Sequence, residues 1–205
     1  VIKFYCTSST ELVQNSTERR RTLRERIIMA VFDEIKLKSF KFTMNDLATR
    51  LSISKTSLYE NFSSKAELIA ACVEYLMLDL KKQESEIYNS NKSVLNKFRQ
   101  LLVIKHKVYP LINTAVYDEL KKNYPEQWEK VNNFRQSRIN NIIELLNDGV
   151  RAGEVVPIKD GVLKIMLNNL FDEAVDEKVL LENNITYADV VNSLVEILIN
   201  GLAKK

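Results

Sequence analysis

The sequence contains few of the residues that form tight turns. It has only 4 glycines and 3 prolines among 205 residues, too few for the many turns of a β protein. Apolar residues instead recur at i, i+3, i+4 and i+7 over most of the length, which is the period of amphipathic helices. With 45% hydrophobic residues, the chain can bury a core in one domain or two small ones. We therefore predict an all-α protein.

Cysteine and histidine are equally scarce, with Cys6, Cys72 and the single His106. No zinc-ligand set or disulfide framework can be built from them, so we expect neither a metal nor a cofactor. The sequence also lacks H-E-x-x-H, a Gly-rich phosphate loop and a nucleophile elbow. We expect no catalytic residues and no enzyme. Two unrelated cysteines fit a reducing compartment, and we predict a cytoplasmic location.

Long hydrophobic runs are absent too. No apolar stretch approaches the roughly 18–20 residues that a membrane span requires, so we expect no membrane partner. The opening segment, residues 1–17, lacks a long apolar core and does not begin with Met. We interpret it as a flexible leader outside the folded part of the chain.

The positive charge is concentrated near the N-terminus. Residues 18–68 carry 11 Lys or Arg against 7 Asp or Glu, a net +4, which leaves −1 for the rest of a chain whose net charge is +3. Such an excess suits a polyanionic partner, although a solvated basic arm would have the same composition.

Short helices with good caps follow a long one in this basic part. Thr43 is a suitable N-cap with Asp46 three residues later, close to a capping box, and Ser54 can cap the next helix. Two helices of about two turns, joined by about four residues, form a helix-turn-helix arrangement. The helices expected here cover 18–37, 44–51, 55–62 and 65–88.

The second short helix turns a polar side outward, because Leu58 and Phe62 form its inward face. In a helix-turn-helix the second helix enters the major groove, where its early residues meet base edges and phosphates. Helix N-termini nearby offer further anion sites. Spacing alone also fits an ordinary helical hairpin with a polar surface. The residues that we predict to contact DNA are Thr43, Ser54, Lys55, Thr56, Ser57, Tyr59, Asn61 and Lys65.

Longer helices follow, and prolines stand at their breaks. The helices expected in this part cover 94–109, 111–123, 126–152, 159–182 and 187–203.

A spaced pattern runs through this part of the chain: Ala30 and Phe32, Phe40, Thr43 with Leu47-Ala48, Ser57-Leu58-Tyr59, Phe62 and Ser64-Lys65. With this pattern, residues 18–70 resemble the DNA-binding domain of the TetR (tetracycline-repressor-like) family of bacterial regulators. Ser39 and Ser52 stand where the family usually has Gly, and if the turn needs a positive φ at Ser52, a serine there costs about 1 kcal/mol. The later segment LNDGVRAGEVVP is similar to the family's loop before its last two helices. The matching positions are Ala30, Phe32, Phe40, Thr43, Leu47, Ala48, Ile53, Ser54, Ser57, Leu58, Tyr59, Phe62, Ser64, Lys65 and Leu68.

The resemblance implies a domain organisation and a mode of action. Residues 18–66 would form the helix-turn-helix domain, and residues 67–205 a larger helical domain for effector binding and dimerisation. It implies a repressor that a small-molecule effector releases from a palindromic operator in double-stranded DNA. A helical protein-interaction module and a ligand-insensitive DNA binder remain as alternatives.

A C2 homodimer is expected because one helix-turn-helix reads few base pairs, whereas two copies about 34–36 Å apart meet successive major-groove faces. In the family, the last two helices form the interface; their apolar stripes would also suit plain core. The residues that we predict for the interface are Ile165, Met166, Asn169, Val190, Leu194, Ile197, Leu198 and Gly201.

The effector is expected to be apolar or aromatic. Its predicted pocket is lined by aromatic side chains, each of which would also suit core filling, and the single His106 would equally suit a surface position. The aromatic residues are Phe98, Tyr109, Tyr117, Trp128, Phe134 and Phe171.

Overall fold

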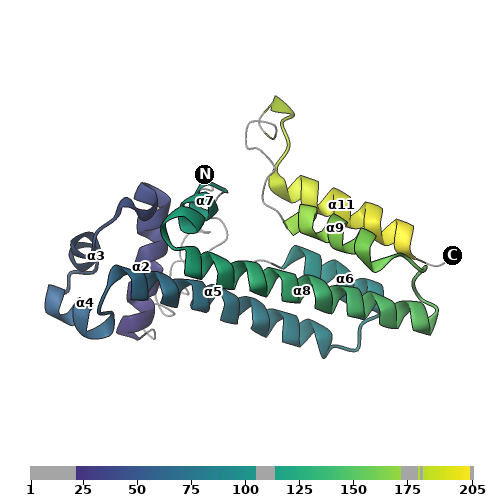
Figure 1. The fold of residues 1–205 in the computed structure, drawn as a ribbon, viewed down its shortest axis with the longest axis horizontal. Coiled ribbons are helices and arrows are strands. Elements are labelled where there is room, and N and C mark those ends of the chain that lie inside the picture. Colours follow the sequence, from purple (N-terminus) through teal and green to yellow (C-terminus); the bar gives the residue numbers. More distant parts are fainter. Residues whose placement is uncertain (1–21, 105–113, 172–179, 181, 204–205) are drawn as a thin grey trace, which may run out of the picture. The chain divides into compact units, whose positions relative to one another are not determined.

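The computed structural model describes residues 22–104, 114–171, 180 and 182–203. Within these ranges every regular element is a helix (Figure 1), which confirms the predicted all-α class. The chain divides into two compact units, an N-terminal unit that ends at Cys72 and a C-terminal unit that begins at Val73. The division falls inside a continuous helix, a few residues beyond the domain boundary predicted at 66/67.

The N-terminal unit is a small helical bundle. In Figure 1, α2, α3 and α4 gather around the first turns of α5. Its elements are α2 (Leu23–Lys38), the 3₁₀ turn η1 (Ser39–Lys41), α3 (Met44–Leu51), α4 (Lys55–Asn61) and the start of α5 (Lys65–Tyr88).

Apolar packing holds this unit together. Helix α4 has only seven residues, and isolated helices shorter than about 12 residues are marginal in water. It persists because Leu58 and the adjoining Phe62 are fully buried, and burial of such a side chain contributes about 1.5–3 kcal/mol. The other fully buried large side chains of this unit are Ile27, Phe32, Phe42, Leu47, Leu68 and Ile69.

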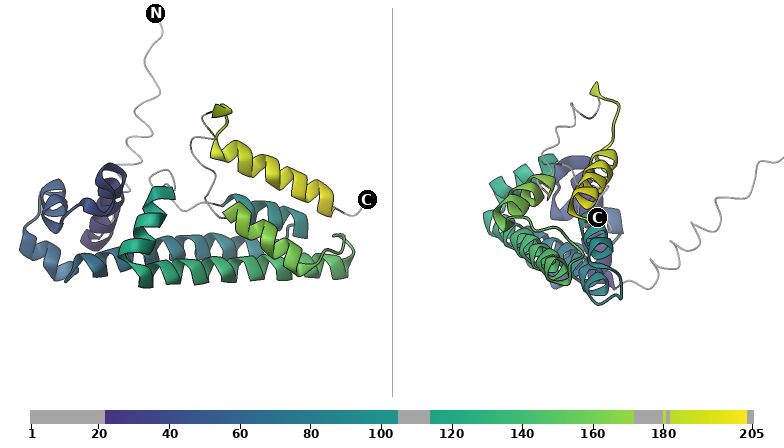
Figure 2. Two further views of the ribbon diagram at one scale, coloured as in Figure 1. Left: turned by 45° about the horizontal axis from the view of Figure 1, so that its top comes forward. Right: turned by 90° about the vertical axis from the view of Figure 1, so that its right-hand side faces the viewer.

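The C-terminal unit is built around the long helix α8, which lies alongside α6 and the second half of α5 (Figures 1 and 2). Helix α8 also packs on α7 and α9, and α11 packs on α6. Its elements after α5 are α6 (Val94–Val103), α7 (Thr114–Asn123), α8 (Pro125–Ala152), α9 (Asp160–Phe171) and α11 (Tyr187–Leu202).

One hydrophobic cluster joins most of these helices. Phe98 and Leu101 of α6, Ile139 and Ile142 of α8, and Leu167 of α9 are fully buried in it. The cluster continues into α11, which contributes four more buried side chains. Cys72 is also buried, close to the border between the units, and burial raises the pKa of its thiol.

Several predicted helix ends were wrong. Helix α2 begins at Leu23 rather than residue 18, because Thr22 and Glu25 form a capping box there. Helix α6 ends at Val103 rather than residue 109, since Ile104 has an extended backbone. Pro125 belongs to the first turn of α8, where its missing N–H costs nothing.

Some predictions lie outside the described residues. These are the leader over 1–17, His106, Tyr109 and most of 172–182. Among the helices that the structure describes, none combines the length and the apolar character needed to cross a bilayer.

Candidate nucleic-acid interface

Two side-chain caps define where the short helices begin. The hydroxyl of Thr43 accepts from the backbone N–H of Asp46 at 3.2 Å, and the Asp46 carboxylate accepts from the backbone N–H of Thr43 at 2.7 Å. This is the capping box that the sequence predicted. Ser54 caps α4 by accepting from the backbone N–H of Ser57 at 3.0 Å. Hydrogen bonds from Thr43, led by its backbone N–H, lower the pKa of Asp46.

Both serines at the family's glycine positions adopt positive φ. Ser52 ends α3 in the left-handed region, at φ 54° and ψ 43°. Ser39 ends α2 at φ 51° and ψ −142°, and its buried hydroxyl has no hydrogen-bond partner. The positive φ considered for Ser52 is therefore present, and Ser39 adds a second one that the sequence did not predict.

The outward face of α4 carries polar groups that the protein does not use internally. Lys55, Thr56 and Tyr59 are exposed, and Tyr59 keeps 49% of its surface accessible. Within the described part of the chain, their side chains have no hydrogen-bond or ion-pair partner. Leu58, between them, is fully buried. Helix α4 thus presents an ammonium and two hydroxyls outward from a fixed base.

Other predicted contacts are used inside the protein. The amide of Asn61 donates to the carbonyl of Ser57 at 2.8 Å, and Ser57 is half-buried. The ammonium of Lys65 donates to the carbonyls of Phe40 at 2.5 Å and Phe42 at 2.6 Å. Partial burial lowers the pKa of Lys65. Lys65 therefore has a structural role in the protein that the sequence did not predict, instead of a free ammonium.

A polar network that sequence reasoning missed joins α2 to α3. The carboxylate of Glu34 is buried, and its Oε1 accepts from Nε of Arg50 at 2.6 Å. The ammonium of Lys38 lies 3.3 Å from Oε2 of Glu34 and 3.4 Å from Oδ1 of Asp46. A buried carboxylate needs such partners, so the network fixes α3 on α2. The hydrogen bond that the Lys38 ammonium donates to the Glu34 carboxylate is the main cause that raises the pKa of Lys38.

Comparison with known proteins agrees with this geometry. Residues 27–72 match the family model described as "Bacterial regulatory proteins, tetR family". The chain is 32% identical over 179 residues to "Uncharacterized HTH-type transcriptional regulator YvaF" of Bacillus subtilis (strain 168), across 87% of this chain and 94% of that protein. The chain belongs to the TetR family of bacterial transcriptional regulators. DNA binding is thereby implied.

Solved structures of transcriptional regulators, one of them described as a TetR-family member, share the fold. PfmR from Thermus thermophilus aligns with a TM-score of 0.63 at 18% identity, over 87% of this chain and 100% of that chain. A transcriptional regulator from Saccharomonospora viridis, in complex with choline, aligns with a TM-score of 0.72 at 15% identity, over 89% and 98% of the two chains.

In this TetR-family protein, the last helices have apolar residues on two faces. One face of α9 and of α11 is buried in the core, through residues such as Leu167 and Val195. On the other face, Ile165 is 65% exposed and Ile197 is 66% exposed. The remaining predicted interface residues divide as follows: Met166, Asn169, Leu194 and Gly201 are exposed, whereas Val190 and Leu198 are half-buried.

The predicted effector aromatics do not share one environment. Phe98 is fully buried in the core. Tyr117 and Trp128 meet edge to face at 6.4 Å. The ammonium of Lys81 lies 5.6 Å from the ring centre of Phe134. The side chain of Phe171, like Tyr109, lies outside the described part of the structure.

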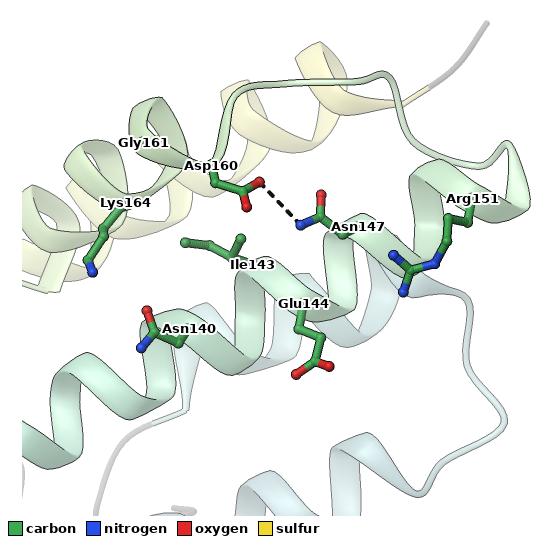
Figure 3. A pocket seen from close by; sticks show the side chains of 8 residues that line it. All are labelled: Asn140, Ile143, Glu144, Asn147, Arg151, Asp160, Gly161 and Lys164. Carbon is green, nitrogen blue, oxygen red and sulfur yellow. Dashed lines mark hydrogen bonds between the residues drawn. The ribbon is translucent and has the colours of Figure 1, made fainter.

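A pocket that the sequence did not predict lies between α8 and α9 (Figure 3). It has a volume of about 430 Å³ and is widely open. The carboxylate of Asp160 accepts from the amide of Asn147 across it at 3.2 Å. None of the predicted aromatics lines it; its residues are Asn140, Ile143, Glu144, Asn147, Arg151, Asp160, Gly161 and Lys164.

Proposed function

We propose that this regulator is a homodimer that binds a palindromic operator through α4 and represses transcription until a small molecule releases it. The observation that carries the proposal is the outward face of α4, where Lys55, Thr56 and Tyr59 are exposed without internal partners among the described residues. An ammonium and hydroxyls suit phosphate oxygens and base edges in the major groove. Thr43 and Ser54 lie exposed at the two helix N-termini beside this face, which suits phosphate contact.

The exposed apolar stripes of α9 and α11 support the dimer. Apolar residues stand at i, i+3 and i+4 on α9 (Val162, Ile165 and Met166) and at i and i+3 on α11 (Leu194 and Ile197), all exposed. Monomeric proteins rarely expose contiguous apolar patches, which usually mark interaction sites. A second copy that offers the same stripes would cover them in a symmetric, isologous interface.

The effector is proposed to be a small apolar or aromatic molecule that binds in the C-terminal unit. The aromatic side chains of α7 and α8, Tyr117, Trp128 and Phe134, support this. The Saccharomonospora viridis regulator, which shares the fold, was solved in complex with the small molecule choline. Release requires that the effector bind the DNA-free conformation better than the DNA-bound one. A cytoplasmic location follows from the DNA partner.

The test is DNA binding to the region beside the protein's own gene, measured by fluorescence anisotropy over a range of salt concentrations. We expect binding that weakens as salt rises, because released counterions drive it. Lys55→Met should lower the salt slope by about 1, whereas Lys130→Met, an exposed lysine of α8, should change nothing. Absence of salt-sensitive binding to any palindrome would contradict the proposal.

The effector is sought by thermal shift against a small-molecule library, followed by anisotropy with each hit. A hit should raise Tm and weaken DNA binding together. If hits raise Tm without any change in DNA affinity, the protein is a DNA binder that ligands do not control.

A further inference from the structure

Two cations on the helices that flank α3 and α4 make the same pair of contacts. On α2, the guanidinium of Arg24 donates to the carbonyl of Asn61 at 2.6 Å, and it lies 4.0 Å from the ring centre of Phe62. Asn61 is the last residue of α4, and Phe62 follows it. Arg24 thus binds a carbonyl at the end of α4 and covers a fully buried ring beside it.

Lys65 repeats this arrangement from α5. Its ammonium donates to the carbonyls of Phe40 and Phe42, and it lies 4.3 Å from the ring centre of Phe42. Phe42 directly precedes Thr43, the N-cap of α3. Lys65 therefore binds the segment before α3 to α5, and Arg24 binds the segment after α4 to α2.

The two cations fix both ends of the helix-turn-helix. Helices α3 and α4 have eight and seven residues, too few to hold their own position. Between the ends, Arg50 of α3 is bound to the buried carboxylate of Glu34 on α2. Each end is then joined to a flanking helix by a cation that contacts a main-chain carbonyl and an aromatic ring together.

These contacts separate both cations from the exposed lysine of α4. Arg24 is half exposed, but its guanidinium is held by the Asn61 carbonyl and the Phe62 ring. An ammonium has three N–H donors, and two of those of Lys65 point at carbonyls inside the protein. Turning Lys65 toward a phosphate would take its ammonium away from both carbonyls and uncover the ring of Phe42. Lys55 is exposed and has no such partners within the described residues.

We propose that Arg24 and Lys65 are positioning residues for DNA binding: they set the placement of α4 and do not neutralise phosphates themselves. The inference rests on the proposed DNA-binding function. It predicts that a variant at either residue binds DNA more weakly while its salt dependence stays that of the parent protein. A variant that has lost a phosphate-binding group has a weaker salt dependence instead. The distinguishing quantity is the slope of log K against log salt, which falls by about 0.9 for each phosphate that the protein no longer neutralises.

The experiment compares Lys65→Met, Arg24→Met and Lys55→Met in the full-length protein, by anisotropy on one operator at several salt concentrations. For Lys65→Met and Arg24→Met we expect affinity to fall about tenfold or more with the salt slope unchanged. For Lys55→Met we expect the slope to fall by about 1. Hydrogen exchange should show faster exchange in α3 and α4 of the first two variants and native protection of α4 in the third.

Conservative variants provide the rescue. Arg24→Lys and Lys65→Arg keep a cationic donor over each ring, so affinity should return to within about threefold of the parent protein. If Lys65→Met does not fold, Lys65→Gln, which keeps an N–H donor without the charge, is measured in its place by the same slope.

The outcomes separate the two proposals. A slope that falls by about 1 in Lys65→Met or Arg24→Met assigns that residue to a phosphate and overturns the positioning role, while the DNA-binding function stands. Unchanged affinity in both variants overturns it as well. If the parent protein shows no salt-sensitive binding, the proposed function itself has failed, which is seen before any variant is measured.

Discussion

The two units end their helices in different ways. All 4 glycines of the chain lie in the C-terminal unit, where Gly153 ends α8 at φ 76°. The N-terminal unit uses serine at positive φ instead. Ser52 ends α3 in the same left-handed region as Gly153, whereas Ser39 ends α2 at φ 51° and ψ −142°. The left-handed backbone costs a serine about 1 kcal/mol that it does not cost glycine. The comparison shows that the N-terminal unit holds unfavourable backbone in place by contacts around it, which include those of Lys65 with main-chain carbonyls.

The surfaces of the units differ as well. Among the described residues, the large apolar side chains exposed on the N-terminal unit are Leu37 and Tyr59, whereas most of the others lie on α9 and α11. The N-terminal unit offers charge and hydroxyls, which suit a hydrated polyanion. The last helices offer aliphatic surface, which suits a second copy of themselves. Substitutions in either unit can test this contrast.

The largest effect is expected from Ile197→Lys, because it places a charge in the exposed stripe of α11. An uncompensated charge in a buried interface costs about 3–5 kcal/mol, so dimer affinity should weaken by more than about 100-fold. Light scattering coupled to size exclusion measures it. Glu129→Gln, an exposed residue of α8, changes the charge equally and should leave the dimer intact. A parent protein that is monomeric at every concentration would contradict the stripe's proposed role.

Gly149 tests the packing of the C-terminal unit. A Cβ there would lie 2.6 Å from Cγ2 of Val155 and 2.8 Å from Cγ1 of Val94. Gly149→Ala should therefore destabilise the protein by about 1–3 kcal/mol, measured by urea unfolding. Gly161, in α9, has open space around it, so Gly161→Ala should instead gain up to about 1 kcal/mol. Equal effects of the two substitutions would contradict the close packing at Gly149.

Substitutions between serine and glycine test the helix ends that have positive φ. Ser52→Gly and Ser39→Gly should each stabilise the N-terminal unit by about 1 kcal/mol, and Gly153→Ser should cost the C-terminal unit about as much. Thermal unfolding measures the three variants. Lower stability in Ser52→Gly would show that the serine side chain makes a contribution larger than the backbone cost.

The smallest effect is expected in the dependence of stability on acidic pH. Hydrogen bonds from Thr43 lower the pKa of Asp46, and hydrogen bonds from Thr186 lower the pKa of Asp189 in the other unit. A depressed carboxyl pKa gives stability that is present above the ordinary value of 3.8 and is lost as pH falls through the depressed value. Unfolding measured between about pH 5 and pH 2.5 should show this decline, and Asp46→Asn should reduce it. An unchanged pH profile in Asp46→Asn would contradict the cap's role.

Local signals were enough to place the short helices. Thr43 and Ser54 mark the starts of α3 and α4 by hydrogen bonds to residues three positions away, so the sequence predicted these starts correctly. The family likeness pointed to a positive φ at Ser52, where a serine stands in place of the usual glycine, but it did not predict the one at Ser39. The domain organisation followed from the same likeness and stays a prediction in its finer detail.

Contacts between distant residues could not be read in this way. Lys65 binds carbonyls 23 and 25 positions earlier, and Arg24 binds one 37 positions later. Their partners are main-chain atoms, which leave no residue-specific trace in the sequence. The pocket between α8 and α9 also escaped prediction, because it depends on how two helices pack. Apolar period alone did not tell which face of α11 is buried, since both faces are apolar.

Cys72 is buried on the continuous helix in which the two units divide, so the rate at which its thiol reacts with a reagent reports on local opening of that helix. A thiol attacks disulfide reagents as its thiolate, and burial keeps this thiol protonated and out of reach. In a Cys6→Ser variant it is the sole sulfhydryl, so its labelling rate counts how often α5 loosens from its neighbours. If added operator or effector changes how often α5 opens, the labelling rate of Cys72 changes with it, and no probe has to be attached to the protein.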